Sequence, residues 1–188
     1  MAVAAACSIT LAPAAHAAEG DGHLSIYAAQ SATDRLAEIL RTTSADLQDS
    51  YLLSVAYGRS FREGRSVRWE WEGQLVRHTG MQRHGELNAV LIIRWMRFPW
   101  DSYIDTRVAF GEGLSHATRE PAIEPRAQRP DEDSTRTLNY LLLEVEAKRP
   151  LSQWSGFLRI HHRSGIAGLF DGVHGGSNFV GLGVRLYR

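Results

Sequence analysis

Residues 155–188 read SGFLRIHHRSGIAGLFDGVHGGSNFVGLGVRLYR, which is the pattern of two β-strands joined by a glycine-rich connection. Successive side chains of a strand point to opposite faces, so Ile160, His162 and Ser164 share one face of the first strand. A histidine two residues before a serine on one face is placed to act as base toward a hydroxyl nucleophile. The rest of the chain must decide whether this face meets a protein core or lipid.

The same alternation runs through most of the chain, with turn residues between the segments. It predicts eight strands, at residues 23–29, 50–60, 66–77, 85–97, 103–114, 136–147, 155–164 and 177–187. Residues 33–42 have helical character and predict a short helix inside a connection. The short connections all fall at one end of the predicted sheet: 61–65, 98–102 and 148–154. The longer ones fall at the other end, an asymmetry typical of outer-membrane barrels.

Each middle strand has one apolar face and one face that carries charges of both signs. In residues 66–77, for example, Trp69 and Trp71 alternate with Glu70 and Glu72. A soluble barrel or sandwich, such as a lipocalin-like binder, would bury the apolar face and leave the charges in water. A membrane barrel turns the apolar face toward lipid and encloses the charges in its lumen.

The supply of charges favours the membrane barrel. Enclosed carboxylates need cationic partners, because unpaired buried charge is too costly. The predicted lumen groups are Glu70, Glu72, Glu144, Glu146, Arg68, Arg94, Arg107, Arg159, His161, Arg163 and Arg185. The chain has 21 Lys and Arg against 21 Asp and Glu, and its five tryptophans and six tyrosines can supply interfacial girdles. We therefore predict an all-β fold, an eight-stranded antiparallel up-and-down transmembrane β-barrel.

Charge and hydropathy narrow the setting further. The zero net charge argues against nucleic-acid binding through a basic field. There is no apolar run of about 18 residues, so a transmembrane helix is not predicted.

The Ala-rich start ends in an Ala-His-Ala sequence, and we predict a signal peptide over residues 1–17 and an outer-membrane barrel domain over 18–188. The alternative interpretation of the Ala-rich start is a flexible N-terminal tail. The only cysteine, Cys7, lies inside the leader, so the predicted mature chain has no thiol chemistry.

On the last strand, Asn178 has the parity of the apolar Val180 and Leu182, so it lies on the same outward face as His162 and Ser164. All three stand at strand ends beside the connection 165–176, which by the loop asymmetry is the external end. These polar residues would meet the outer leaflet of the membrane.

A His-x-Ser on the penultimate strand of an exported eight-stranded barrel resembles the lipid A 3-O-deacylase family of outer-membrane barrels, as a divergent member. The resemblance is architectural over the mature chain and specific only across residues 155–188. It implies a serine esterase that removes an ester-linked acyl chain from lipid A on the barrel exterior, without a metal or other cofactor. Ser164 would be the nucleophile and His162 the general base, and the position of the family's acidic residue falls on Asn178.

Two positions depart from the family pattern. Asn178 can orient a histidine but carries no charge to stabilise the imidazolium. Gly165 stands where the family has an oxyanion-stabilising Asn, and its backbone N–H is the candidate donor. Glu112, Asp171 and His174 are alternatives for the third group.

The sequence leaves three functions open. The first is an outer-membrane hydrolase of lipid A, as part of lipopolysaccharide, or of phospholipid. The second is a catalytically inactive outer-membrane barrel with a structural or envelope-interaction role, and the third is the soluble binder. A cation site at Glu112, Glu120 and Glu124 is a weaker alternative to a solvated acidic loop.

Overall fold

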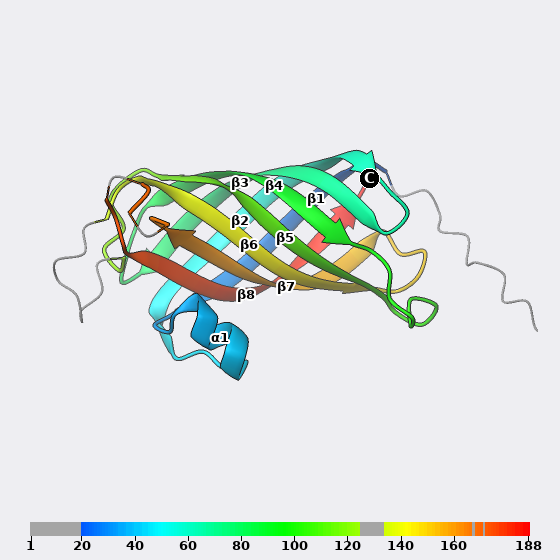
Figure 1. The fold of residues 1–188 in the computed structure, drawn as a ribbon, viewed down its shortest axis with the longest axis horizontal. Helices are drawn as coiled ribbons and strands as arrows, with labels where there is room; N and C mark the ends of the chain where they lie inside the picture. The colour runs from blue at the N-terminus through cyan, green and yellow to red at the C-terminus, as the bar shows by residue number, and fades with distance from the viewer. Residues whose placement is uncertain (1–19, 125–133, 167, 171) are drawn as a thin grey trace, which may run out of the picture.

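A computed structural model describes residues 20–124, 134–166, 168–170 and 172–188. Eight antiparallel strands form a closed barrel in which each pairs with the next and the last pairs with the first (Figure 1). They are β1 (Gly22–Ala32), β2 (Leu47–Glu63), β3 (Val67–Gly80), β4 (Gly85–Trp95), β5 (Asp105–Ala117), β6 (Thr137–Lys148), β7 (Trp154–Ser164) and β8 (Gly176–Tyr187). The predicted eight-stranded barrel is confirmed. The predicted signal peptide lies outside the described residues.

The short helix α1 (Leu36–Thr42) follows β1 and lies outside the barrel wall, within the segment where the sequence predicts a helix (Figure 1). Glu38 accepts the Arg35 backbone N–H at 2.9 Å at the start of the helix, and Thr43 adopts the left-handed conformation at its end. No helix within the described ranges is long and apolar enough to cross a membrane.

The two faces of the barrel wall have opposite chemistry. Outward side chains are apolar and exposed, with Leu75 and Leu182 retaining 68% and 69% of their accessible surface. Inward side chains on the same strands are buried and often charged, as Arg94 and Arg185 are. This is the reverse of what a soluble lipocalin-like barrel requires, since that fold points its apolar residues inward.

The buried charges of the lumen are paired. Glu144 accepts hydrogen bonds from Arg94 at 2.7 Å, Arg159 at 2.5 Å and Arg185 at 2.8 Å. Arg94 also binds Glu70 at 3.1 Å. Each guanidinium presents five donors in a rigid fork, so one arginine can bridge two carboxylates. The predicted pairing of the central glutamates with arginines is therefore observed.

At the ends of the lumen the pairing is local. Arg68 lies 3.1 Å from Glu63 on the adjacent strand, and Arg107 lies 2.9 Å from Asp105 on its own strand. These contacts involve acids that the sequence pattern did not single out.

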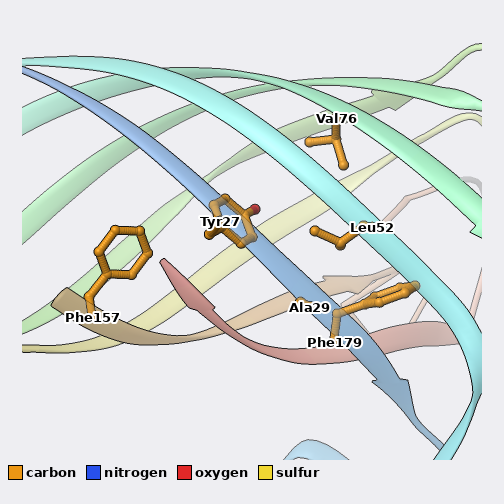
Figure 2. Packing of buried hydrophobic residues seen from close by; sticks show 6 residues of the cluster. All are labelled: Tyr27, Ala29, Leu52, Val76, Phe157 and Phe179. Atoms are coloured by element: carbon orange, nitrogen blue, oxygen red, sulfur yellow. The ribbon is translucent and has the colours of Figure 1, made fainter. Parts of the chain in front are cut away.

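Small apolar clusters fill the remaining lumen space. One cluster brings together inward side chains from five strands: Tyr27, Ala29, Leu52, Val76, Phe157 and Phe179. Figure 2 shows Phe157 and Phe179 on either side of Tyr27. The Tyr27 hydroxyl donates to Gln74 Oε1 at 3.2 Å and lies 2.7 Å from His161 Nδ1. The apolar cluster is therefore connected to the polar network of the lumen by hydrogen bonds.

Connection lengths follow the predicted asymmetry with one exception. β3 continues further than the alternation predicts, so only residues 81–84 join it to β4, whereas 96–104 join β4 to β5 at the opposite end. The other connections at the first end, 33–46, 118–136 and 165–175, are longer, and we refer to it as the loop end.

The tryptophans gather toward the end opposite the loop end. All five are exposed and lie at or near strand ends there: Trp69, Trp71, Trp95, Trp100 and Trp154. Such a band is typical of the interfacial girdle on one side of a membrane barrel.

Candidate active site

The three predicted site residues come together on the outer face of β7 and β8 at the loop end. His162 on β7 stands directly opposite Asn178 on β8 in the strand register, and Ser164 stands opposite Gly176. Parity places His162 and Ser164 outward, and both side chains are half-buried. Asn178 retains only 1% of its accessible surface although its parity is outward. Some other part of the chain must therefore cover it.

That cover is the connection from β1 to β2. The side-chain amide of Asn178 donates from Nδ2 to the backbone carbonyl oxygen of Asp34 at 2.7 Å. The connection is closed at its base, because Asp34 Oδ2 accepts the Asp46 N–H at 2.5 Å and the Thr33 N–H donates to the Asp46 carbonyl at 2.9 Å. The carbonyl of Asp34 is thus held in place against Asn178.

This contact fixes the orientation of the Asn178 amide, and with it the histidine tautomer. A carbonyl oxygen can only accept, so the nitrogen of the amide must face Asp34 and Oδ1 must face His162. The Oδ1 atom lies 2.6 Å from His162 Nδ1 and, being an acceptor, requires the proton on Nδ1. In the neutral ring the acceptor nitrogen is then Nε2, the atom through which a general base acts.

The glycine after the serine has no room for a side chain. A Cβ atom on Gly165 would lie 1.9 Å from the carbonyl oxygen of Val173, so the asparagine found here in the family of resemblance does not fit. The Gly165 N–H donates to the Gly175 carbonyl at 3.2 Å. This N–H would reach a bound oxyanion only if that bond opened.

The alternative third groups are not beside His162. Glu112 lies on the outer face of β5 in the same cross-strand row, but Leu141 of β6 stands between it and His162. His174 is exposed in the connection between β7 and β8, and Asp171 lies outside the described residues.

The three acids of the weaker cation hypothesis are likewise apart. Glu112 is on the barrel wall and Glu120 is exposed, whereas Glu124 is fully buried at the loop end of the lumen. Glu124 accepts from Arg163 at 2.8 Å and from Ser177 at 3.1 Å. The prediction of a solvated acidic loop is therefore wrong for Glu124, because the segment that carries this residue folds back over the lumen.

A second polar cluster, not singled out by the sequence, lies inside the wall at the same end. His78 Nε2 lies 2.9 Å from Glu86 Oε2, and the rings of His78 and His84 stack with centroids 4.2 Å apart. Burial, together with the charge of the neighbouring His78, lowers the pKa of His84 to about 4. A period-2 pattern gives no sign of this cluster, because His84 lies in the turn between β3 and β4.

No family model matches the chain, and no curated protein matches it. Solved structures with a similar fold include the outer membrane enzyme PagL, with a TM-score of 0.58 and 13% identity over 87% of this chain and 98% of that one. Neisserial surface protein A is similar with a TM-score of 0.53 and 9% identity, over 92% of this chain and 100% of that one. At these identities the likeness concerns the fold, which is that of eight-stranded outer-membrane barrels.

Proposed function

We propose that this chain is an outer-membrane acyl-ester hydrolase that acts on lipid A, or on phospholipid of the outer leaflet, through Ser164 and His162. The observation that carries the proposal is the hydrogen-bonded series from the Asp34 carbonyl through Asn178 to His162 Nδ1, with distances of 2.7 Å and 2.6 Å. It prepares Nε2 as a base on the strand face that also carries Ser164.

The reaction would be a two-step acyl transfer. His162 Nε2 takes the proton of Ser164 Oγ as the oxygen attacks the ester carbonyl of the lipid. The tetrahedral intermediate collapses, the lipid hydroxyl leaves with the proton from the imidazolium, and the acyl chain remains on Ser164. A water molecule then gives a proton to His162 and attacks the acyl-serine, which releases the fatty acid and restores the hydroxyl.

An asparagine in place of an acid is compatible with this chemistry only if its side-chain amide cannot flip. In serine proteases an Asp-to-Asn change lowers kcat by about 10⁴-fold because the wrong histidine tautomer is stabilised. Here the Asp34 carbonyl opposes such a flip, because turning the amide would bring two oxygens together. Asn178 still supplies no charge for the imidazolium, so we expect a slow enzyme.

The surroundings of the site suit a lipid substrate at the membrane surface. The apolar outer belt is interrupted near the loop end by Glu112 and His116 on β5 and by His162 and Ser164 on β7. Charged side chains on a lipid-facing wall are tolerated near the interface rather than at the centre of the bilayer. Ester bonds of outer-leaflet lipids lie at this depth, which also supports the predicted export to the outer membrane.

The decisive variant is Ser164→Ala. Cells that produce the wild-type chain should contain lipid A or phospholipid that lacks one acyl chain by mass spectrometry, and cells with Ser164→Ala should not. Ser66→Ala is a matched control, because Ser66 is also half-buried but lies at the opposite end of the barrel. Acyl loss that persists in Ser164→Ala would exclude this serine as the nucleophile.

The non-enzymatic envelope barrel is the second candidate function. It is favoured by the engagement of the Gly165 N–H with Gly175 and by the lack of charge at Asn178. Absence of any acyl loss in cells that assemble the wild-type barrel would favour it. Assembly is checked by heat-modifiable gel migration of the detergent-extracted protein.

Asn178→Ala tests the orienting role specifically. The variant removes both the contact to His162 and the contact to Asp34, so the histidine loses its fixed tautomer. We expect hydrolysis to fall by about 10²- to 10⁴-fold, the range attributed to a positioned general base. A shift of the pH optimum would accompany the loss if Asn178 acts through His162, whereas a purely structural role would reduce the amount of folded barrel instead.

A further inference from the structure

We propose that the loop end of the lumen binds one divalent transition-metal ion, with Zn²⁺ as the representative, through His78, His84 and Glu86. This site lies inside the barrel, on the opposite side of the wall from Ser164, and it does not depend on the proposed hydrolysis. We call these three residues the lumen triad.

The geometry of the lumen triad is compact. One potential ligand atom from each residue can be chosen so that all three lie within 4.8 Å of one another. His78 is near the end of β3, Glu86 is near the start of β4, and the tight turn 81–84 between them carries His84. A short turn thus brings two imidazoles and one carboxylate together, which is a ligand set that zinc uses in proteins.

The second observation is an unsatisfied nitrogen. His84 retains 3% of its accessible surface, and its Nε2 atom has no hydrogen-bond partner in the part of the chain that the structure describes. A buried polar atom without a partner is costly and needs an explanation. A metal ion bound at this end of the lumen would supply the missing partner.

Gln82 is placed to become the outer-shell partner of His78. Its Nδ1 lies 3.1 Å from the side-chain nitrogen of Gln82, and its Nε2 lies 2.9 Å from Glu86. A metal-bound histidine donates its other ring N–H to an acceptor. On metal binding the Gln82 amide would therefore turn and present Oε1, which has no hydrogen-bond partner among the described residues. An ion entering between His78 and Glu86 would replace the proton that the two now share.

The surrounding charges leave Glu86 available to a cation. Arg163 Nε lies 4.0 Å from Glu86, but the same guanidinium is bound to Glu124 at 2.8 Å. His161 Nε2 lies 3.0 Å from the other oxygen of Glu86 and brings a third imidazole near the site. Two or three imidazoles with one carboxylate favour a borderline ion such as Zn²⁺ over Ca²⁺, which prefers six to eight oxygen ligands.

The test uses the untagged full chain, folded in detergent and stripped with a chelator. Isothermal titration with Zn²⁺ alone should show one ion bound per chain, and titration with Ca²⁺ should show no binding. Loss of an outer-shell partner already lowers metal affinity by about 10- to 100-fold, so His84→Ala should weaken Zn²⁺ binding by at least about 10-fold. His116→Ala is the matched control, because His116 is at the same end but on the outer face, and its binding should equal that of the wild type.

The outcomes separate cleanly. Zn²⁺ binding that is absent from the wild type, or unchanged in His84→Ala, overturns the proposal. X-ray absorption of the zinc-loaded wild type gives an independent readout if His84→Ala does not fold: a shell with at least two imidazoles supports the site, and a shell without them overturns it. Neither readout uses lipid hydrolysis, so the proposed function and the metal site can fail separately.

Discussion

The two faces of β7 show how one strand serves two environments. Its inward residues Arg159, His161 and Arg163 are fully buried and contact acids of other strands. Its outward residues are apolar along most of the strand and become polar only at the loop end, at His162 and Ser164. The inner face of β7 is thus part of the lumen network, whereas His162 and Ser164 interrupt an apolar belt on the outer face.

The difference between the inner and outer faces of β7 indicates where a functional residue can be recognised. A buried charge in the lumen is explained by the pairing that keeps the barrel closed, so it carries little information about activity. A polar side chain on the lipid-facing surface takes no part in that pairing, so its presence needs another explanation. His162 is therefore the more informative histidine of the adjacent pair 161–162.

The largest expected effect comes from breaking the inner face. Glu144→Leu leaves Arg94, Arg159 and Arg185 short of a shared acceptor in the lumen. Removing one partner of a buried ionic network typically costs about 3–5 kcal/mol. Urea unfolding in lipid vesicles should show a loss of this size, and Leu182→Ala on the outer face should show a much smaller one. Equal losses would contradict the division between the two faces.

The next effect comes from placing a charge on the outer face. Leu158→Arg, in the middle of β7, should lower the free energy of unfolding by about 2–4 kcal/mol, because a cation near the bilayer midplane is poorly solvated. Trp154→Arg, at the end of the same strand, should cost only about 0–1 kcal/mol near the interface. The ratio of the two values measures how deep each position lies. The reverse order would mean that the belt is not in contact with lipid.

The smallest effect concerns a single hydroxyl. Tyr27→Phe removes the contacts to Gln74 and His161 from the lumen and takes from the buried His161 Nδ1 its hydrogen bond to the hydroxyl. The expected cost is about 1–3 kcal/mol in the same unfolding measurement. Tyr57→Phe is the control, because the Tyr57 ring is exposed on the outer face and packs against Trp71. A cost for the control as large as that for Tyr27→Phe would show that position on the wall does not matter.

The sequence predicts the fold because a barrel wall repeats every two residues. The alternation of Trp69 and Trp71 with Glu70 and Glu72 is enough to give each strand its two faces. The same parity rule places His162, Ser164 and Asn178 on one face, as the structure finds.

The remaining features depend on groups that have no sequence pattern. The Asp34 carbonyl orients Asn178, yet any residue at position 34 would present a carbonyl, so nothing in the sequence marks it. The lumen triad depends on the short turn 81–84. The alternation ends the preceding strand at residue 77, whereas β3 runs to Gly80, so the predicted connection is too long. Burial of Glu124 depends on how a connection folds back, and local sequence does not specify that.

The contact between Asn178 and Asp34 also crosses the seam of the barrel. β8 pairs with β1 to close the sheet, with Asn178 opposite Ala32, and Asp34 follows β1 by two residues. The hydrogen bond that orients His162 therefore forms only after the first and last strands have met. An unfolded chain has no oriented histidine, so the proposed hydrolysis requires the assembled barrel. Under the proposed function, barrel closure is thus the step that creates the oriented base.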